Sequence, residues 1–433
     1  MNNTPTNNPL ITLENGLKIC LITKKNINTI SINCFIRVGS TFEIPENSGI
    51  SHFLEHMIFR GNQKLGNTKT TYRKIEAIGG NINATTSCDQ TEIYLDYHKR
   101  FLKTGIQYFC DFIKFPTFEN IETERKIILE ESLIDYNSRH ELIDTDTLTA
   151  QCIWPENALN LPIVGSQASI KTINLEKVQS WYRKFYVPNN MIIGITGDFD
   201  KQDVLQLLEQ EMKLLKADEK LPVPEVAIID VDSEKQAQFV FDDENQYTIQ
   251  WSFPLETENI NDYITTQLIN RILDDGSSSQ LQRLIREEKG LVYDISSDIS
   301  YFKHGVLLAI RCSVSKNKAM ELMNVLVQLI RDIVNNGFQS KDIELAKLRY
   351  QLSLDCYTDS LRGLLSEALN PHIFPYLPDF KIISRIINSV DKDIINQVTN
   401  SIFNQNKSSF VMVGPIDKSI KQKILPLINH WVQ

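Results

Sequence analysis

The sequence lacks the features that mark several other classes of protein. Its 433 residues include no apolar run of about 18 residues, so no transmembrane helix is expected. The formal net charge of −9 disfavours a protein that binds nucleic acid or anionic lipid through basic patches. The first thirteen residues carry no Lys or Arg and no long apolar stretch, which is unlike a secretory signal. The absence of Walker, GxGxxG and GxSxG motifs argues against nucleotide-dependent and serine-hydrolase chemistry.

Cysteines give no sign of a disulfide framework. There are seven, their number is odd, they are widely spaced, and no CxxC pair occurs. This pattern is typical of reduced thiols and differs from cysteine zinc sites. We therefore expect a cytoplasmic protein, with an organellar or exported form that has lost its leader as the alternative. The cysteines are Cys20, Cys34, Cys88, Cys110, Cys152, Cys312 and Cys356.

Composition and length predict a soluble globular protein with more than one domain. Hydrophobic residues make up 42% of the chain and charged residues 23%, which is enough apolar material for a buried core. A length of 433 residues exceeds that of a usual single domain. Pro222 and Pro224 lie in a charged segment near the middle of the chain, and prolines at this spacing favour extended chain. We predict one domain over residues 1–215, a linker over 216–236 and a second domain over 237–433.

The two predicted domains share landmarks that indicate an internal duplication. An apolar run followed by Gly, one residue, an apolar residue and Asp ends each domain, and the glycines concerned, Gly197 and Gly414, are 217 residues apart. A helix-like segment ending in Gly61 aligns with one ending in Gly276, at an offset of 215. Strand-like and helix-like stretches mix without strict alternation, which predicts an α+β fold with helices packed on antiparallel sheets. The predicted strands include 18–23, 30–38, 92–97 and 191–197, and the predicted helices include 50–60, 72–78, 122–136, 175–185, 262–273 and 316–335.

The most informative segment is SHFLEHM at residues 51–57. His52 and His56 are four residues apart, so on a helix both imidazoles lie on one face, as two zinc ligands require. Glu55 lies beside them, close enough to act on a water at the metal, and the HxxEH pattern is that of inverted zincins. Only about 0.01 matches are expected by chance from this composition, so a solvated helix face with a salt-bridging Glu is the weaker alternative.

A catalytic zinc site needs a third protein ligand, and residues 121–132 offer candidates. Glu124 and Glu131 are seven residues apart, which is two helical turns along one face. One of them could bind the metal while the other orients a ligand through a hydrogen bond. Taken alone, the stretch fits an ordinary amphipathic helix with a charged face better.

With these residues in place, the chain resembles the insulinase/pitrilysin family of zinc metallopeptidases. It is most similar to the short branch, which includes the mitochondrial processing peptidase, and the resemblance spans nearly the whole chain. The family's third ligand is a Glu that follows the second His at the distance seen here, where Glu131 lies 75 residues after His56. Glu130 is the alternative register, and Glu124 matches the family's supporting carboxylate. The resemblance implies one zinc ion per chain, held by His52, His56 and Glu131, with Glu55 as the catalytic base.

A second segment that matches the family is GGNINATTS at residues 79–87. On its own it contains two turn glycines and a short strand whose edge could pair with an extended peptide. A plain hairpin arm is the simpler alternative. The resemblance implies that this strand binds substrate through Asn83, Ala84, Thr85 and Thr86.

The second domain matches the family at Arg286 and Tyr293, which are seven residues apart. The resemblance implies that this pair holds the substrate carbonyl and its oxyanion, and a guanidinium and a phenol are suitable donors for that charge. The positions aligned with the zinc motif are Gln267, Asn270 and Arg271, so this domain is not expected to hold zinc there.

These observations predict a zinc metalloendopeptidase. The resemblance implies that two chains, identical or homologous, close around a chamber that admits short or unfolded peptides. A general peptidase, a presequence-type processing enzyme and a leader-peptide maturation protease all remain open as specific roles. The alternative is an inactive structural or peptide-binding subunit of the same fold. It is disfavoured because every catalytic position is filled and the glycine-rich loop of the non-catalytic processing-peptidase subunit is missing.

Overall fold

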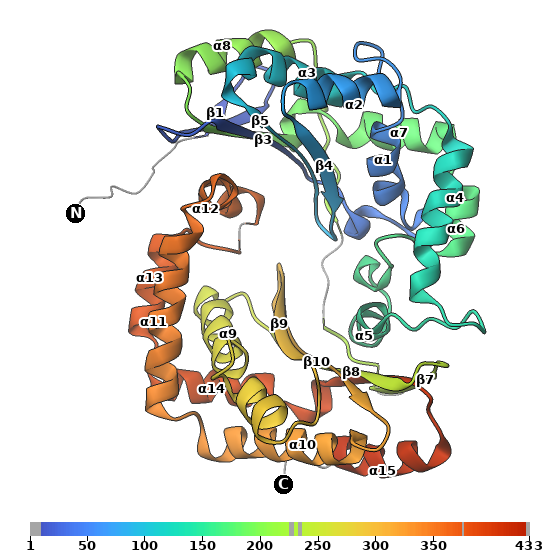
Figure 1. The fold of residues 1–433 in the computed structure, drawn as a ribbon, viewed down its shortest axis with the longest axis vertical. Helices are drawn as coiled ribbons and strands as arrows, with labels where there is room; N and C mark the ends of the chain where they lie inside the picture. Colours follow the sequence, from blue (N-terminus) through green and yellow to red (C-terminus); the bar gives the residue numbers. More distant parts are fainter. Residues whose placement is uncertain (1–9, 225–228, 233–235, 375, 430–433) are drawn as a thin grey trace. The chain divides into compact units, whose positions relative to one another are not determined.

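Two β-sheets organise the described part of the protein, one in each of two units (Figure 1). A computed structural model describes residues 10–224, 229–232, 236–374 and 376–429. Within these ranges, no helix is both long enough and apolar enough to span a bilayer. Unit 1 comprises Met1–Ser132, Leu161–Glu225 and Cys356–Phe374, and unit 2 comprises Leu133–Asn160, Val226–Asp355 and Pro375–Gln433.

The two units differ from the predicted continuous domains at two segments. Residues 133–160 precede the predicted boundary yet belong to unit 2, and residues 356–374 follow it yet belong to unit 1. Where the predicted linker, 216–236, is described, it contains neither helix nor strand, and its residues 225–228 and 233–235 lie outside the described residues. Each unit is therefore assembled from segments that are distant in sequence.

The sheet of unit 1 has the strand order β1-β2-β6-β3-β5-β4. β2 and β6 are parallel, and the other neighbouring pairs are antiparallel. Side chains alternate between the two faces, so Ile19 and Leu21 of β2 enter one apolar cluster while Cys20 and Ile22 enter another. The strands are β1 (Ile11–Thr12), β2 (Lys18–Thr23), β3 (Thr29–Ile36), β4 (Asn81–Thr86), β5 (Thr91–His98) and β6 (Met191–Gly197).

Helices pack against both faces of this sheet. On one face, α1 and α7 contribute residues such as Phe53 and Phe185 to the main core of the unit. On the other face, α12 buries Leu365 and Leu369, and a side chain at Gly194 of β6 would collide with both leucines. The helices are α1 (Ile50–Ile58), α2 (Thr68–Ala77), α3 (Leu102–Lys114), α4 (Ile121–Ser132), α6 (Gln167–Thr172), α7 (Leu175–Phe185), α8 (Lys201–Met212) and α12 (Leu361–Ile373).

The sheet of unit 2 has the strand order β7-β11-β8-β10-β9. Its strands are β7 (Ala237–Phe241), β8 (Gln246–Glu256), β9 (Ile295–Phe302), β10 (Gly305–Ser315) and β11 (Ser409–Gly414). The helices of this unit are α5 (Thr145–Ile153), α9 (Ile260–Leu273), the π-helix Gln282–Glu288, α10 (Ala319–Asn336), α11 (Ser340–Tyr357), α13 (Phe380–Ser389), α14 (Lys392–Ile402) and α15 (Lys418–Asn429).

The two sheets confirm the predicted duplication. Taken in spatial order, β2-β6-β3-β5-β4 of unit 1 corresponds strand for strand to β7-β11-β8-β10-β9 of unit 2. In both sheets the first pair of this series is parallel and the later pairs are antiparallel. The predicted α+β class is therefore confirmed. The predicted helix 122–136 ends earlier, at Ser132, where the chain leaves unit 1 for unit 2.

One pair of corresponding helices is exchanged between the halves of the sequence. α5 lies in the first half but packs on β11 and β8 of unit 2, and α12 lies in the second half but packs on β6 and β2 of unit 1. α5 begins at Thr145 and α12 at Leu361, close to the offset of the repeat. Each sheet is thus covered on one face by a helix that the other half of the chain supplies.

Candidate metal centre

The HxxEH motif lies on α1, and the apolar pattern of that helix explains how it is oriented. Residues three and four apart form one buried stripe, which fixes the rotation of the helix about its axis. The polar residues of the motif then face outward from that stripe, and α1 lies against both α4 and β4. The buried apolar residues are Ile50, Phe53, Leu54, Met57 and Ile58.

The N-terminus of α1 is held by a residue from outside the helix. Gly49 precedes the helix with a φ of 86° and provides no side-chain cap. Instead, the Glu43 carboxylate accepts hydrogen bonds from the Gly49 N–H at 2.6 Å and the Ser51 N–H at 2.9 Å. Glu43 is only 4% exposed. Burial raises the pKa of Glu43 to about 7, against the opposing effect of the two N–H donors.

His52, His56 and Glu131 form a group of metal-ligand type. Their candidate ligand atoms all lie within 4.8 Å of one another. Each carboxylate oxygen of Glu131, on α4, lies 3.6 Å from the Nε2 of one histidine. Glu130, the alternative register, is exposed and outside this group among the described residues. The side chain of Glu131 is 41% exposed, so the group is open to solvent on that side.

These positions fit a zinc ion. Two ligands of tetrahedral zinc, each about 2.0–2.2 Å from the metal, lie about 3.4 Å from each other. That separation is close to the 3.6 Å between each Nε2 and the nearest Glu131 oxygen. Since 3.6 Å is too long for a hydrogen bond, the group is spaced for a cation between its members and not for direct contact.

Glu124 supports the group from α4. It is 4% exposed and lies 2.7 Å from the Nδ1 of His56, which leaves the Nε2 of that ring for a metal. Arg60, one turn after His56, hydrogen-bonds through Nε to the other oxygen of Glu124. Burial opposes ionisation of Glu124, but its bonds to His56 and Arg60 outweigh burial and lower its pKa. The carboxylate is therefore charged and fixed.

The two histidines differ in their surroundings. Burial lowers the pKa of His52 to about 3, with a further contribution from His56, so this imidazole is neutral, as a metal ligand must be. Burial also disfavours the charged form of His56, but the neighbouring Glu124 outweighs it and raises the pKa. The Nδ1 of His52 is buried without a hydrogen-bond partner among the described residues.

Glu55 is held by the neighbouring strand. The hydroxyl of Thr86, on β4, donates a hydrogen bond to Oε2 of Glu55. Burial raises the pKa of Glu55, while the Thr86 hydrogen bond opposes this shift. A carboxylate with a raised pKa is suited to take a proton and to give it back near neutral pH.

β4 forms the edge of its sheet. It pairs with β5, and its other edge carries no strand among the described residues of unit 1. Asn83 and Thr85 are exposed, whereas Ala84 points into the core. An open edge beside the histidine–glutamate group is the arrangement that adds an extended peptide as a further strand.

Arg286 and Tyr293 lie together in unit 2. Arg286 belongs to the π-helix Gln282–Glu288, and its guanidinium carbon is 5.9 Å from the centre of the Tyr293 ring. Tyr293 is 88% exposed, which is unusual for so large an aromatic side chain. A π-turn often marks a functional position in a helix. Their role in holding substrate stays a prediction.

Sequence reasoning missed three supporting contacts. Arg60 could have been found, because it follows His56 by four residues within the predicted helix 50–60 and would share its face there. The hydrogen bond from Thr86 to Glu55 joins a strand to a helix, and no local pattern predicts it. Glu43 also carries no local signal, since it resembles any other acidic residue in a connecting segment.

The chain belongs to the insulinase family of peptidases, family M16. The profile described as "Insulinase (Peptidase family M16)" matches residues 18–167, and that described as "Peptidase M16 inactive domain" matches residues 172–350. The second match covers much of the half in which the sequence lacks the zinc motif. The predicted family is therefore confirmed.

Individual relatives agree with this assignment. An uncharacterized zinc protease of Rickettsia bellii is 28% identical over 413 residues, covering 93% of this chain and 96% of the relative. The mitochondrial-processing peptidase subunit beta of Dictyostelium discoideum is 28% identical over 211 residues, covering 48% and 44%. Among solved structures, a protease from Helicobacter pylori superposes with a TM-score of 0.84 at 19% identity, covering 94% of this chain and 99% of that one. The last comparison supports the fold alone.

Proposed function

We propose that this protein is a zinc metalloendopeptidase that cleaves short or unfolded peptides. The observation that carries the proposal is the grouping of His52, His56 and Glu131, whose candidate ligand atoms lie within 4.8 Å of one another, with Glu55 adjacent in sequence and bonded to Thr86. When bound there, zinc would supply Lewis acidity toward the peptide carbonyl and toward water. His52, His56 and Glu131 would hold it, and Glu124 would orient His56.

Glu55 is the proposed general base. Its carboxylate takes a proton from the attacking water and returns it to the departing amine, so one group serves both halves of the reaction. The raised pKa favours the first step, because a more basic carboxylate is a better acceptor for the water proton. Thr86 holds this carboxylate in one orientation through its hydroxyl.

Substrate binding is proposed at the open edge of β4. Backbone groups of residues 83–86 would pair with an extended peptide, which requires that the peptide be unfolded over this stretch. Arg286 and Tyr293 would donate hydrogen bonds to the carbonyl oxygen as negative charge develops on it. Both side chains are sufficiently exposed to reach a ligand.

An assembly of two chains around a chamber is proposed as the working form. The family resemblance supports it, and one matched relative is by name a subunit of a larger peptidase. Whether the second chain is identical or homologous decides whether the purified protein is active alone. A reducing, cytoplasmic location is also proposed, and no disulfide joins any of the seven cysteines, all of which lie in the described part of the chain.

Digestion of an unbiased peptide library tests the proposal. The purified protein is incubated with the library with and without a chelator, and the cleaved bonds are identified by mass spectrometry. Cleavage that stops with chelator and returns with zinc is expected. The matched variant is Glu55→Gln, which should keep zinc and peptide binding but lose nearly all turnover. Zinc and peptide binding without turnover in the native protein would instead support the inactive-subunit alternative.

A further inference from the structure

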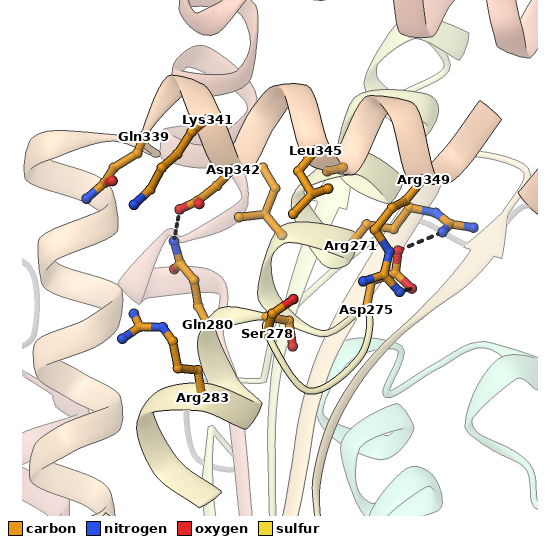
Figure 2. Close-up of a pocket in the computed structure, with 13 residues that line it drawn as sticks. Arg271, Asp275, Ser278, Gln280, Arg283, Gln339, Lys341, Asp342, Leu345 and Arg349 are labelled. Carbon is orange, nitrogen blue, oxygen red and sulfur yellow. Dashed lines mark hydrogen bonds and ion pairs between the residues drawn. The ribbon is translucent and has the colours of Figure 1, made fainter. Parts of the chain in front are cut away.

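A charged pocket in unit 2 has no part in the proposed peptidase site. It has a volume of about 430 Å³ and lies between the end of α9, the loop that follows it and the start of α11 (Figure 2). Figure 2 shows Lys341 and Asp342 extending from α11 toward Gln280 and Arg283 on the facing segment. The pocket is therefore bounded by elements of one unit only.

Positive charge exceeds negative charge in the lining. The two carboxylates are Asp275 and Asp342, and the four cations are Arg271, Arg283, Lys341 and Arg349. Asp275 is already neutralised, because Arg271 contacts it at 2.9 Å and Arg349 at 3.1 Å. The charge that remains available is therefore mainly cationic.

Two cations in the pocket, Lys341 and Arg283, are available to a ligand. Lys341 has no hydrogen-bond or ion-pair partner among the described residues. Within the described ranges, the Arg283 side chain pairs only with Glu288. Both side chains are about half exposed, so water competes strongly with this pair.

The backbone of α11 also contributes positive potential at the pocket. α11 is 18 residues long and begins at Ser340, so its positive end lies at the pocket beside Lys341. The facing loop contributes the exposed hydroxyl of Ser278. Helix N-terminus, ammonium, guanidinium and hydroxyl together form a donor set suited to a phosphate group.

The repeat gives an independent reason to expect a ligand. In element order, α9 and α11 correspond to α1 and α4, the helices of the metal centre. With Gly276 aligned on Gly61, Arg271 takes the position of His56 and Asp275 that of Arg60. Corresponding helices therefore carry metal-ligand side chains in unit 1 (α1 and α4) and cationic side chains in unit 2 (α9 and α11).

We propose that this pocket binds a small molecule through a phosphate group. Lys341, Arg283 and the first turn of α11 bind the phosphate oxygens. Asp275 keeps the two deeper guanidiniums in place. The proposal does not depend on peptidase activity, because it uses residues of unit 2 alone.

Isothermal titration with inorganic phosphate tests the proposal, at ionic strength held constant with chloride. Saturable binding of one phosphate per chain is expected. The double variant Lys341→Ala with Arg283→Ala should weaken binding by at least about tenfold. Lys392→Ala removes an exposed lysine elsewhere in unit 2 and should leave the affinity within about twofold. Circular dichroism confirms that each variant is folded, and Lys341→Gln replaces the double variant if that one is not.

Three outcomes would overturn the proposal. The first is no saturable phosphate binding, and the second is equal affinity in the double variant and the native protein. The third is binding that is lost in Glu131→Gln but kept in the double variant, which would locate the phosphate at the metal centre. Citrate is titrated in parallel. If citrate binds through Lys341 and Arg283 while phosphate does not, the pocket accepts carboxylates and the phosphate assignment is wrong.

Discussion

Glu43 offers a test of how the metal helix is held in place. Its carboxylate is buried and accepts the Gly49 and Ser51 N–H groups at the start of α1, immediately before His52. Glu43→Ala would leave both donors without an acceptor, at about 1–3 kcal/mol for each buried N–H. Glu43→Gln keeps the shape and one acceptor but cannot ionise. The two variants therefore separate the cap from the charge.

The pH dependence follows from the pKa of Glu43, which burial raises from 4.5 to about 7. A carboxyl whose folded pKa is raised contributes stability that is complete below the unfolded pKa and is lost as pH rises through the folded pKa. Integrating between these two values gives a loss of about 2.5 kcal/mol for the native protein between pH 5 and pH 8. Glu43→Gln cannot ionise and does not lose this stability. Between pH 5 and pH 8, its free energy of unfolding should therefore rise by that amount relative to the native protein.

Hydrogen exchange measures this effect locally. Amides of residues 50–58 are followed by mass spectrometry in native and variant protein at the same pH, so that intrinsic exchange rates cancel. Chelator is present throughout, to remove any contribution from metal. Glu46→Gln, an exposed neighbour of Glu43, is the matched control and should behave as the native protein does. A difference between native protein and Glu43→Gln that stays constant from pH 5 to pH 8 would refute the titration, and normal protection in Glu43→Ala would refute the cap.

Three further predictions concern the proposed active site. Glu131→Gln should lose most of its zinc in elemental analysis because only two protein donors remain, whereas Glu130→Gln should keep it; the reverse result would move the ligand by one position. Thr86→Val should lower turnover about tenfold and move the acid limb of the pH–rate profile to higher pH, because the hydrogen bond that opposes the raised pKa of Glu55 is lost. Thr86→Ser keeps the hydroxyl and should restore both the rate and the profile. An unmoved profile in Thr86→Val would contradict the role given to this hydroxyl. If each active site combines the zinc half of one chain with Tyr293 of an identical second chain, Tyr293→Phe should lower the rate about 10²–10³-fold. Mixing this variant with Glu55→Gln should then restore roughly a quarter of native activity, since half of the dimers contain one intact site. No recovery despite subunit exchange would reject the shared site.

Short-range patterns predicted the centre of the site. The spacing of His52 and His56 fixes their common face once the segment is helical, and the apolar stripe of α1 requires that helix. The glycines before β4 and the alternation within it likewise predicted an edge strand. The position of Glu131 depended on the resemblance to a family, because spacing alone allowed Glu130 as well. The structure brings Glu131 to the two histidines.

Contacts between distant segments were not predictable in this way. Glu43 and Thr86 act on α1 from a connecting segment and from a strand, and their importance depends on where those elements pack. The predicted continuous domains missed the exchange of α5 and α12 for a similar reason. An amphipathic helix reveals that it has an apolar face, but its sequence does not say which of two similar sheets that face covers.

Because α5 and α12 are exchanged, the second half of the sequence, which lacks a zinc motif, has a structural role in unit 1, which contains that motif. The sheet of unit 1 has a second apolar face, which includes Cys20 and Phe35. The helix that buries this face, α12, begins at Leu361, in the second half of the chain. Unit 2 depends in the same way on α5, whose Leu148 packs with Val411 and Val413. A segment covering the first half alone would therefore leave its sheet uncovered and its α5 without a partner. Both halves are needed to bury either sheet, so loss of metal ligands from the second half removes a site without making that half dispensable.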